Sequence, residues 1–338
     1  MLNIDDLSER LRQACRVLLT THQTPDGDGI GCLLALLLAL ETPERTAVIV
    51  NDGEIPPHFD FLPGSDRTFD WNRLDPARRS AALAGVDLAL AVDTHAWAML
   101  GTVGEALREA AIPTVFVDHH PILDGSNPNV FCDPEASSAG EVCWRLIQHL
   151  GGPVGPDAAT CLYAAIAYDT NSFKYLRGRS EPHRAAAALI AHGADTDAIY
   201  RHVFASNSAG KVAFLSELLH SIERCEDGRV AWVVISRALV DQTGVTRDDL
   251  RDAVTQLLEI EGVEVAVMFH EREDTSYKVS LRSKGNYPVS QVACRLAGGG
   301  HLFAAGANSD GPLDTLQRRV FDLVHELMQE PLRPTSAP

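Results

Sequence analysis

The sequence predicts an α/β fold with two domains, a parallel-sheet domain followed by a smaller α/β domain. The chain has 338 residues, and a domain usually holds about 100–200. In the first half, short apolar segments alternate with helical patterns, and a polar residue follows each apolar segment. Strands that are apolar throughout are typical of sheets covered on both faces, and their alternation with helices indicates a parallel sheet.

Four apolar segments define the strands of the first sheet: 16–20, 46–50, 86–92 and 114–117. Helices are expected from near Gly31 and over 137–150, 157–168 and 182–193, and Ser138 and Glu141 have the spacing of a capping box at the start of the second of these. Because the carboxyl ends of parallel strands meet at one edge of a sheet, polar residues that follow the strands are expected to gather there.

The second unit has helical patterns over 209–224, 247–260, 289–297 and 313–329, and strand patterns over 229–236, 264–271 and 276–283. In the last strand, Lys278, Ser280 and Arg282 alternate with Val279 and Leu281, which gives the strand a polar and an apolar face. We assign residues 1–180 to the first domain, 181–208 to a linker, 209–330 to the second domain and 331–338 to a disordered tail.

Composition and charge exclude several classes of protein. The longest apolar run is shorter than the roughly 18 residues that a membrane span needs, and the acidic N-terminus lacks the features of a signal peptide, so a cytoplasmic location is expected. The seven cysteines form no C-x-x-C pair and are expected to be reduced. A net charge of −17 disfavours a protein that coats long nucleic acids.

The segment "THQTPDGDGIG" places His22, Asp26 and Asp28 on a glycine-rich loop after the first strand. Two carboxylates two residues apart can each face a separate cation, and the imidazole can close on one of them. A turn that caps the following helix explains the same residues equally well, because Asp is favoured at helix starts.

Further donors follow the next strands: Asp93 after the third, and Asp118, His119 and His120 in "VFVDHHP" after the fourth. A single residue of this kind is usually a cap or a solvated side chain. Several at one edge would repel one another and favour divalent cations. A mixture of Asp and His suits Mn²⁺, with Mg²⁺ or Co²⁺ as alternatives, and the absence of clustered cysteines argues against structural zinc.

Two more segments carry candidate residues. Asp169 in "YDTNSF" ends a helix, where the helix dipole disfavours a carboxylate, so a bound metal would explain its place. In "AGGGHLFAAG", the glycines expose backbone amides and His301 can donate to a phosphate oxygen, although a flexible turn explains the glycines as well. Arg282, with Lys278 nearby, supplies positive charge for an anion.

The motifs H-x-x-P-D-x-D, a strand-end Asp, DHHP, YDTNSF and GGGH-x-x-AAG, in this order, resemble the DHH phosphoesterase superfamily in the branch with the DHH-associated C-terminal domain. The resemblance spans residues 14 to 307. Within the branch the chain is most similar to the small NrnA-type enzymes, which degrade short RNA (nanoRNases) and remove phosphate from 3′-phosphoadenosine 5′-phosphate. It implies an active-site cleft between the two domains.

The resemblance also implies roles for these residues. One Mn²⁺ would be held by His22, Asp26 and Asp93, and a second by Asp28, Asp93, His119 and Asp169, with Asp93 as the bridge. Asp118 would orient a histidine from behind the ligands, and His120 would face the scissile phosphate. The substrate would be anchored by Arg282, Gly299, Gly300 and His301.

The sequence departs from the family pattern in two places. Cys32 stands where the family usually has Ser after the motif glycine, and Met99 and Leu100 lie where an Arg commonly follows the Asp of the second motif. We expect the first departure to alter helix packing and the second to weaken a phosphate contact, with neither touching a predicted ligand.

The expected reaction is hydrolysis of a phosphoester by a water that two cations activate, with short RNA or a small nucleotide as substrate. Alternative substrates are cyclic di-AMP and its linear product pApA. An inorganic pyrophosphatase shares the first constellation, and a nucleotide-binding regulator without activity is a further alternative. The sequence leaves the oligomeric state open, with a homodimer as one option.

Overall fold

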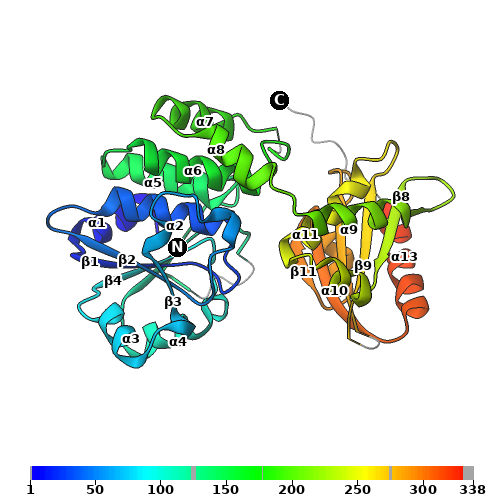
Figure 1. Cartoon of the computed structure of the whole chain (residues 1–338), viewed down its shortest axis with the longest axis horizontal. Coiled ribbons are helices and arrows are strands. Elements are labelled where there is room, and N and C mark those ends of the chain that lie inside the picture. Colours follow the sequence, from blue (N-terminus) through cyan, green and yellow to red (C-terminus); the bar gives the residue numbers. More distant parts are fainter. Residues whose placement is uncertain (1, 123–126, 177, 274–275, 330–338) are drawn as a thin grey trace. The chain divides into compact units, whose positions relative to one another are not determined.

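A computed structural model describes residues 2–122, 127–176, 178–273 and 276–329 (Figure 1). The predicted tail, 331–338, lies outside the described residues. The chain divides into two compact units, residues 1–206 and 207–338, and the boundary falls within the segment that we assigned to a linker. None of the helices in the described ranges is long and apolar enough to cross a membrane.

The first unit contains a six-stranded parallel sheet in the order β3-β2-β1-β4-β5-β6. The four predicted strands are confirmed as β1 (Arg16–Thr20), β2 (Thr46–Asn51), β4 (Leu88–Val92) and β5 (Thr114–Asp118). The edge strands β3 (Thr68–Asp70) and β6 (Val130–Cys132) were not predicted. Three residues are too few for a periodic pattern to identify a strand.

Helices cover both faces of this sheet (Figure 1). One face packs against α1 (Ile4–Gln13), α2 (Gly27–Leu40), α5 (Ala139–Leu150) and α6 (Pro156–Asp169), and the other against α3 (Pro76–Leu83) and α4 (Gly101–Glu109). Helices α7 (Glu181–Ala191) and α8 (Thr196–Ile199) complete the unit. Successive strand residues such as Leu18 and Leu19 face opposite cores, which explains why the strands are apolar throughout.

Helix α2 begins at Gly27, four residues before the predicted start at Gly31. The carboxylate of Asp26 accepts the backbone N–H groups of Asp28 (3.1 Å) and Gly29 (3.5 Å), so it is the N-cap of this helix. The glycines that follow it are helical, and their lack of side chains serves close packing instead of a turn.

The second unit contains a mixed sheet in the order β11-β12-β10-β9-β8-β7, in which only β8 and β9 pair in parallel. Its strands are β7 (Glu223–Arg224), β8 (Val230–Ile235), β9 (Val265–Glu273), β10 (Ser276–Ser283), β11 (Gly299–His301) and β12 (Ala304–Asp310). The segment "GGGHLFAAG" therefore forms most of a β-hairpin. Because it holds six glycine and alanine residues, its sequence carried no strand signal.

Helices also cover this second sheet. On one face, α9 (Ala209–His220) and α11 (Arg247–Leu258) pack against β8 and β9, while α12 (Ser290–Arg295) and α13 (Leu313–Gln329) cover the opposite face. The short helix α10 (Arg237–Thr243) was not predicted, and the predicted helix 209–224 ends at His220 because residues 223–224 form β7.

Gly31 allows α2 and α6 to lie close together. A Cβ atom at Gly31 would stand 2.5 Å from the backbone oxygen of Cys161. We predict that Gly31→Ala lowers the free energy of unfolding by about 1–3 kcal/mol, because the clash outweighs the higher helix propensity of Ala. Gly152→Ala is the control, since its Cβ would lie 3.5 Å from its nearest neighbour. Equal urea midpoints for the two variants would contradict the prediction.

Candidate metal centre

The carboxyl ends of β1, β4 and β5 bring together side chains from four chain segments. His22 follows β1, and its Nε2 atom lies 3.9 Å from Oδ1 of Asp26 and 3.5 Å from Oδ2 of Asp93. Asp26 thus caps α2, which confirms the helix-cap interpretation of this loop, and it also faces the imidazole of His22, which is compatible with the cation interpretation. The three side chains come within 4.8 Å of one another, close enough to hold one metal ion.

Asp93 follows β4 and lies at the centre of the cluster. Its backbone has a φ of 60°, which is unusual for a residue other than glycine, and its N–H donates to the oxygen of Val117 in β5 (2.8 Å). A conformation of this kind costs roughly 1–3 kcal/mol and persists where the surroundings impose it. Here it turns a buried carboxylate toward two imidazoles.

His119 follows β5 and is surrounded by three carboxylates. Its Nε2 atom lies 3.7 Å from Asp28, 3.6 Å from Asp93 and 3.6 Å from Asp169. Two ligands that share a cation at about 2.1 Å stand roughly 3–4 Å apart, so these separations suit a shared ion. Asp28, His119 and Asp169 form a second group whose ligand atoms lie within 4.8 Å of one another.

The first residues of helix α5 hold the carboxylate of Asp28 through hydrogen bonds. Its two carboxylate oxygens accept the backbone N–H groups of Ala139 (2.7 Å) and Gly140 (2.8 Å) at the start of that helix, where the dipole favours an anion.

The expectation that Cys32 touches no predicted ligand is wrong. Cys32 lies one helical turn after Asp28, so its thiol reaches Oδ1 of that carboxylate at 3.7 Å.

Asp118 forms a further group with Asp93, His119 and His120, whose ligand atoms lie within 4.8 Å of one another, but its own hydrogen bonds are to His95, His119 and His120. Its Oδ1 atom accepts the N–H groups of His119 (2.8 Å) and His120 (3.1 Å), and also Nδ1 of His120 (2.8 Å). Its Oδ2 atom accepts Nδ1 of His95 at 2.5 Å. Asp118 therefore positions two imidazoles, those of His95 and His120, while the side chain of His119 turns toward the other carboxylates.

The sequence analysis missed His95. It stands two residues after Asp93 in "VDTHAW", so its place beyond the end of the third predicted strand was the available signal. Its contact with Asp118 depends on the pairing of β4 with β5, which a single sequence does not show.

The charges of the cluster suit a bound cation. Burial and the neighbouring Asp93 raise the pKa of Asp28 well above its usual value. Burial opposes ionisation of Asp93, but the nearby imidazoles of His119 and His22 lower its pKa. Burial also opposes protonation of His119, yet the contact with Asp93 and the charges of Asp169 and Asp28 raise its pKa to about 10. In the protein without metal, a proton on His119 compensates part of the negative charge.

The oxygen and nitrogen atoms that the cluster offers as ligands fit a divalent cation. The Oδ1 atom of Asp93 is buried, and no donor within the described residues makes a hydrogen bond to it. Carboxylate oxygens and imidazole nitrogens suit Mn²⁺ and Mg²⁺ better than a closed zinc site of thiolates. The structure thus brings together all six predicted ligands, but their role as ligands stays a prediction.

The predicted substrate residues lie in the second unit. Arg282 in β10 pairs with Ala304 in β12, and Ala304 pairs with His301 in β11, so Arg282 and His301 share one face of the sheet. Gly299 and Gly300 precede His301 and are exposed. A Cβ at Gly300 would lie 2.7 Å from Ala305, and its φ of 134° favours glycine. Their contact with a substrate stays a prediction, as does the cleft.

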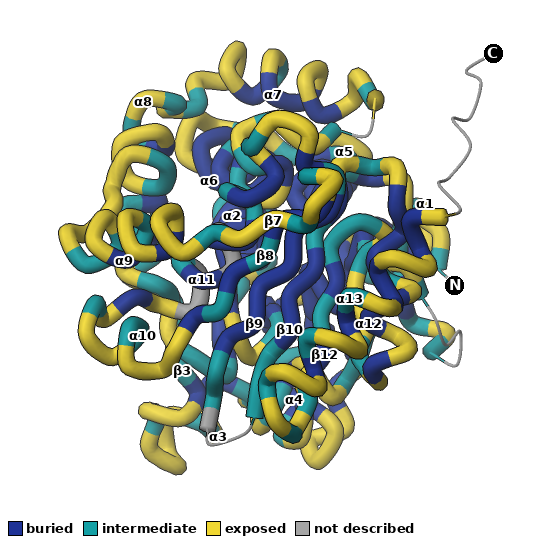
Figure 2. The backbone as a smooth tube through the Cα atoms, turned by 90° about the vertical axis from the view of Figure 1, so that its right-hand side faces the viewer, coloured by how far each residue is buried: buried dark blue, intermediate teal, exposed yellow. Residues whose placement is uncertain are grey.

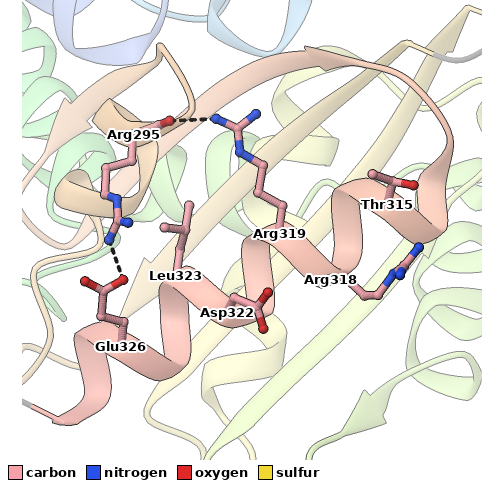
Figure 3. Close-up of a pocket in the computed structure, with 7 residues that line it drawn as sticks. All are labelled: Arg295, Thr315, Arg318, Arg319, Asp322, Leu323 and Glu326. Carbon is pink, nitrogen blue, oxygen red and sulfur yellow. Dashed lines mark hydrogen bonds and ion pairs between the residues drawn. The ribbon is translucent and has the colours of Figure 1, made fainter.

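A hollow of about 510 Å³ lies elsewhere in the second unit, against α12 and α13 (Figure 3). Arg295 pairs with Glu326 (2.6 Å), and Arg319 donates to the backbone oxygen of Arg295 (3.0 Å). None of the predicted site residues lines this hollow.

Two family models match the chain. Residues 16–166 match the N-terminal domain of the DHH family, and residues 228–330 match the DHHA1 domain. The bifunctional oligoribonuclease and PAP phosphatase NrnA of Thermus thermophilus is 29% identical over 322 residues, 92% of this chain and 89% of that protein. The cyclic-di-AMP phosphodiesterase PdeA of Listeria monocytogenes is 30% identical over 305 residues, but the match covers only 45% of that protein.

Among solved structures, an exopolyphosphatase-related protein from Bacteroides fragilis matches 97% of this chain and 97% of its own, with a TM-score of 0.87 and 23% identity. This similarity shows that the two proteins share a fold.

The raised pKa of His119 predicts a pH dependence of metal binding. Below about pH 10 its imidazole carries a proton, which must leave before Nε2 can bind a cation. Titration with Mn²⁺ at pH 7 should therefore release about one proton, and the affinity should rise with pH by up to about tenfold per unit. Calorimetry in two buffers of different ionisation enthalpy measures the release, and heats that are independent of the buffer would contradict the assignment.

Proposed function

The chain belongs to the DHH family of phosphoesterases, with a DHHA1 domain after the DHH domain, and we propose that it hydrolyses short oligoribonucleotides to mononucleotides and 3′-phosphoadenosine 5′-phosphate to AMP. The observation that carries the proposal is the pair of ligand groups that meet around Asp93 and His119. The similarity to NrnA over 89% of that enzyme supports this choice of substrates.

We assign His22, Asp26 and Asp93 to one divalent cation and Asp28, Asp93, His119 and Asp169 to the other, with Mn²⁺ as the proposed metal. Such a pair of cations supplies an activated water and neutralises charge on the phosphoryl oxygens. The chain's own part is to hold the ligands in place. The amides of α5 fix Asp28, and the backbone bond to Val117 fixes Asp93.

His120 is the proposed catalytic histidine, and Asp118 its positioning residue. The side chain of His120 is 39% exposed, whereas that of His119 is 4% exposed, so His120 is the imidazole of the pair that a substrate can reach. Hydrogen bonds from His120 and His95 outweigh the effect of burial and lower the pKa of Asp118 to about 2. The carboxylate holds Nδ1 of His120, and we assign to Nε2 the contact with a phosphoryl oxygen or the protonation of the leaving group.

A second candidate activity is hydrolysis of cyclic di-AMP or pApA. The similarity to the cyclic-di-AMP phosphodiesterase PdeA, at 30% identity, favours it. This chain spans less than half the length of PdeA, so the remaining part of that protein has no counterpart in the match. The two activities use the same proposed metal centre and differ in the substrate that is accepted.

A panel of substrates tests the proposed function. With Mn²⁺, we expect turnover of 3′-phosphoadenosine 5′-phosphate and of two- to five-nucleotide RNA, slower action on long RNA, and little on cyclic di-AMP or pyrophosphate. Release of mononucleotides is measured by chromatography at equal substrate concentrations. Preference for cyclic di-AMP would establish the second candidate, and hydrolysis of pyrophosphate alone would refute both.

The adjacent histidines separate metal binding from chemistry. We expect His119→Ala to weaken Mn²⁺ binding by at least about 100-fold, since loss of a supporting residue alone costs 10–100-fold. His120→Ala should keep the Mn²⁺ affinity within about twofold and lower kcat about 10²–10⁴-fold. Calorimetry and single-turnover rates measure the two effects. His149→Ala, which removes an imidazole paired with Asp5, is the control and should change neither.

A further inference from the structure

Asp118 holds two imidazoles, and only that of His120 has a part in the proposed chemistry. Oδ2 of the carboxylate accepts Nδ1 of His95 (2.5 Å), and Oδ1 accepts Nδ1 of His120 (2.8 Å). The two oxygens of one carboxylate are about 2.1 Å apart, because each C–O bond is only about 1.23 Å long, so the two rings stand next to each other. The side chain of Asp118 is 1% exposed, whereas that of His95 is 26% exposed. His95 therefore lies beside His120 and is open to solvent.

The Nε2 atom of His95 is the atom of this ring that a ligand can use. Within the described ranges, the ring makes its hydrogen bond through Nδ1, to Asp118, and Nε2 makes none. The bonding directions of the two ring nitrogens diverge, so a ring whose Nδ1 faces a buried carboxylate turns Nε2 away from it. The partly exposed ring thus offers Nε2 to a polar group of a substrate.

The chain around His95 is held in place on its C-terminal side. The backbone N–H of Ala96 donates to Oγ1 of Thr94 (3.3 Å), and the ring of Trp97 packs edge-on against Phe116 in β5, with the ring centroids 5.1 Å apart. Helix α4 follows, and it buries one side against the sheet and exposes the other (Figure 2). A side chain that is already fixed loses little conformational freedom when it binds a ligand.

The segment that carries His95 suits a neutral polar ligand better than a phosphate. Between Asp93 and Glu105 the sequence has no Lys or Arg, and Met99 stands where the family resemblance leads us to expect an Arg. Phosphate oxygens are bound most strongly by cations that form bidentate hydrogen bonds. A hydroxyl group needs no such cation, because it both donates and accepts a hydrogen bond.

The proposed reaction places a ribose hydroxyl next to the bond that breaks. When 3′-phosphoadenosine 5′-phosphate is hydrolysed to AMP, water adds to the 3′-phosphorus, the P–O3′ bond breaks, and O3′ takes up a proton. The 2′-hydroxyl is attached to the neighbouring ribose carbon. With His120 at the phosphoryl group or the leaving O3′, an imidazole beside it is suitably placed for this hydroxyl. The hydroxyl can pair with Nε2 whether the ring is neutral or protonated.

We propose that Nε2 of His95 binds the 2′-hydroxyl of the nucleotide whose 3′-phosphate is cleaved, and that the protein thereby favours ribonucleotides over deoxyribonucleotides. This inference rests on the proposed function and adds a residue that recognises the sugar, since the 2′-hydroxyl is the group that distinguishes RNA from DNA. Asp118 would then orient one imidazole for the phosphate and another for the ribose. If His95 served only to hold Asp118, its loss would slow ribonucleotides and deoxyribonucleotides alike.

Kinetics with Mn²⁺ on 3′-phosphoadenosine 5′-phosphate and on its 2′-deoxy analogue test the proposal. His95→Asn keeps an amide nitrogen that can donate to Asp118 but has no atom in the place of Nε2. The ratio of kcat/KM for the two substrates should fall about three- to tenfold, the effect of one hydrogen bond. Comparing the ratio in the two proteins cancels the effect that the hydroxyl itself has on the leaving group. The Mn²⁺ affinity, measured by calorimetry, should stay within twofold.

His149→Asn is the matched control, because it makes the same substitution at an imidazole that also pairs with an aspartate, Asp5 (2.9 Å), in the last turn of α5. It should leave the ratio unchanged. An unchanged ratio in His95→Asn, whatever its overall rate, would overturn the proposal while the proposed function stands, and so would a larger change in Mn²⁺ affinity, which would place the effect at the metal centre. Failure of the unaltered protein to hydrolyse either bisphosphate would refute the proposed function on this substrate, and the inference with it.

Discussion

Repulsion among clustered carboxylates at the carboxyl edge of the first sheet is the constraint that organises this unit. Asp28 and Asp93, which are buried, and Asp169, which is partly exposed to solvent, all approach Nε2 of His119 within 3.7 Å. Burying several negative charges together is costly unless a positive charge joins them. In the absence of metal, a proton on His119 supplies part of that charge, and a divalent cation would supply it more completely.

Hydrogen bonds, a helix end and close helix packing together hold these charged groups near one another. Helix α5 directs two amides at Asp28, and α6 ends at Asp169. Gly140 in α5 and Gly31 in α2 lie against α6 so closely that a Cβ atom at either would clash with it. The close contacts of α2, α5 and α6 therefore set the separation between Asp28 and Asp169. Helix packing and the geometry of the candidate metal centre depend on the same small residues.

Much of this arrangement could be predicted from the sequence, because apolar strands with polar residues after them identify the edge of a parallel sheet. That reasoning, together with the family resemblance, led to Asp93, Asp118 and His119. It did not find the contact of His95 with Asp118 or the amides that hold Asp28, since both join segments far apart in the chain. Nor did it find the hairpin of β11 and β12, whose small residues pack in a sheet without a periodic pattern.

The central claim is that Asp93 lies between two cations. Anomalous diffraction from crystals of the protein grown with Mn²⁺ tests it directly. The account predicts two peaks roughly 3.5–4 Å apart, one beside His22 and Asp26 and one beside His119 and Asp28, with a carboxylate oxygen of Asp93 in contact with each. A single peak that does not touch Asp93, or peaks only outside this cluster, would contradict it.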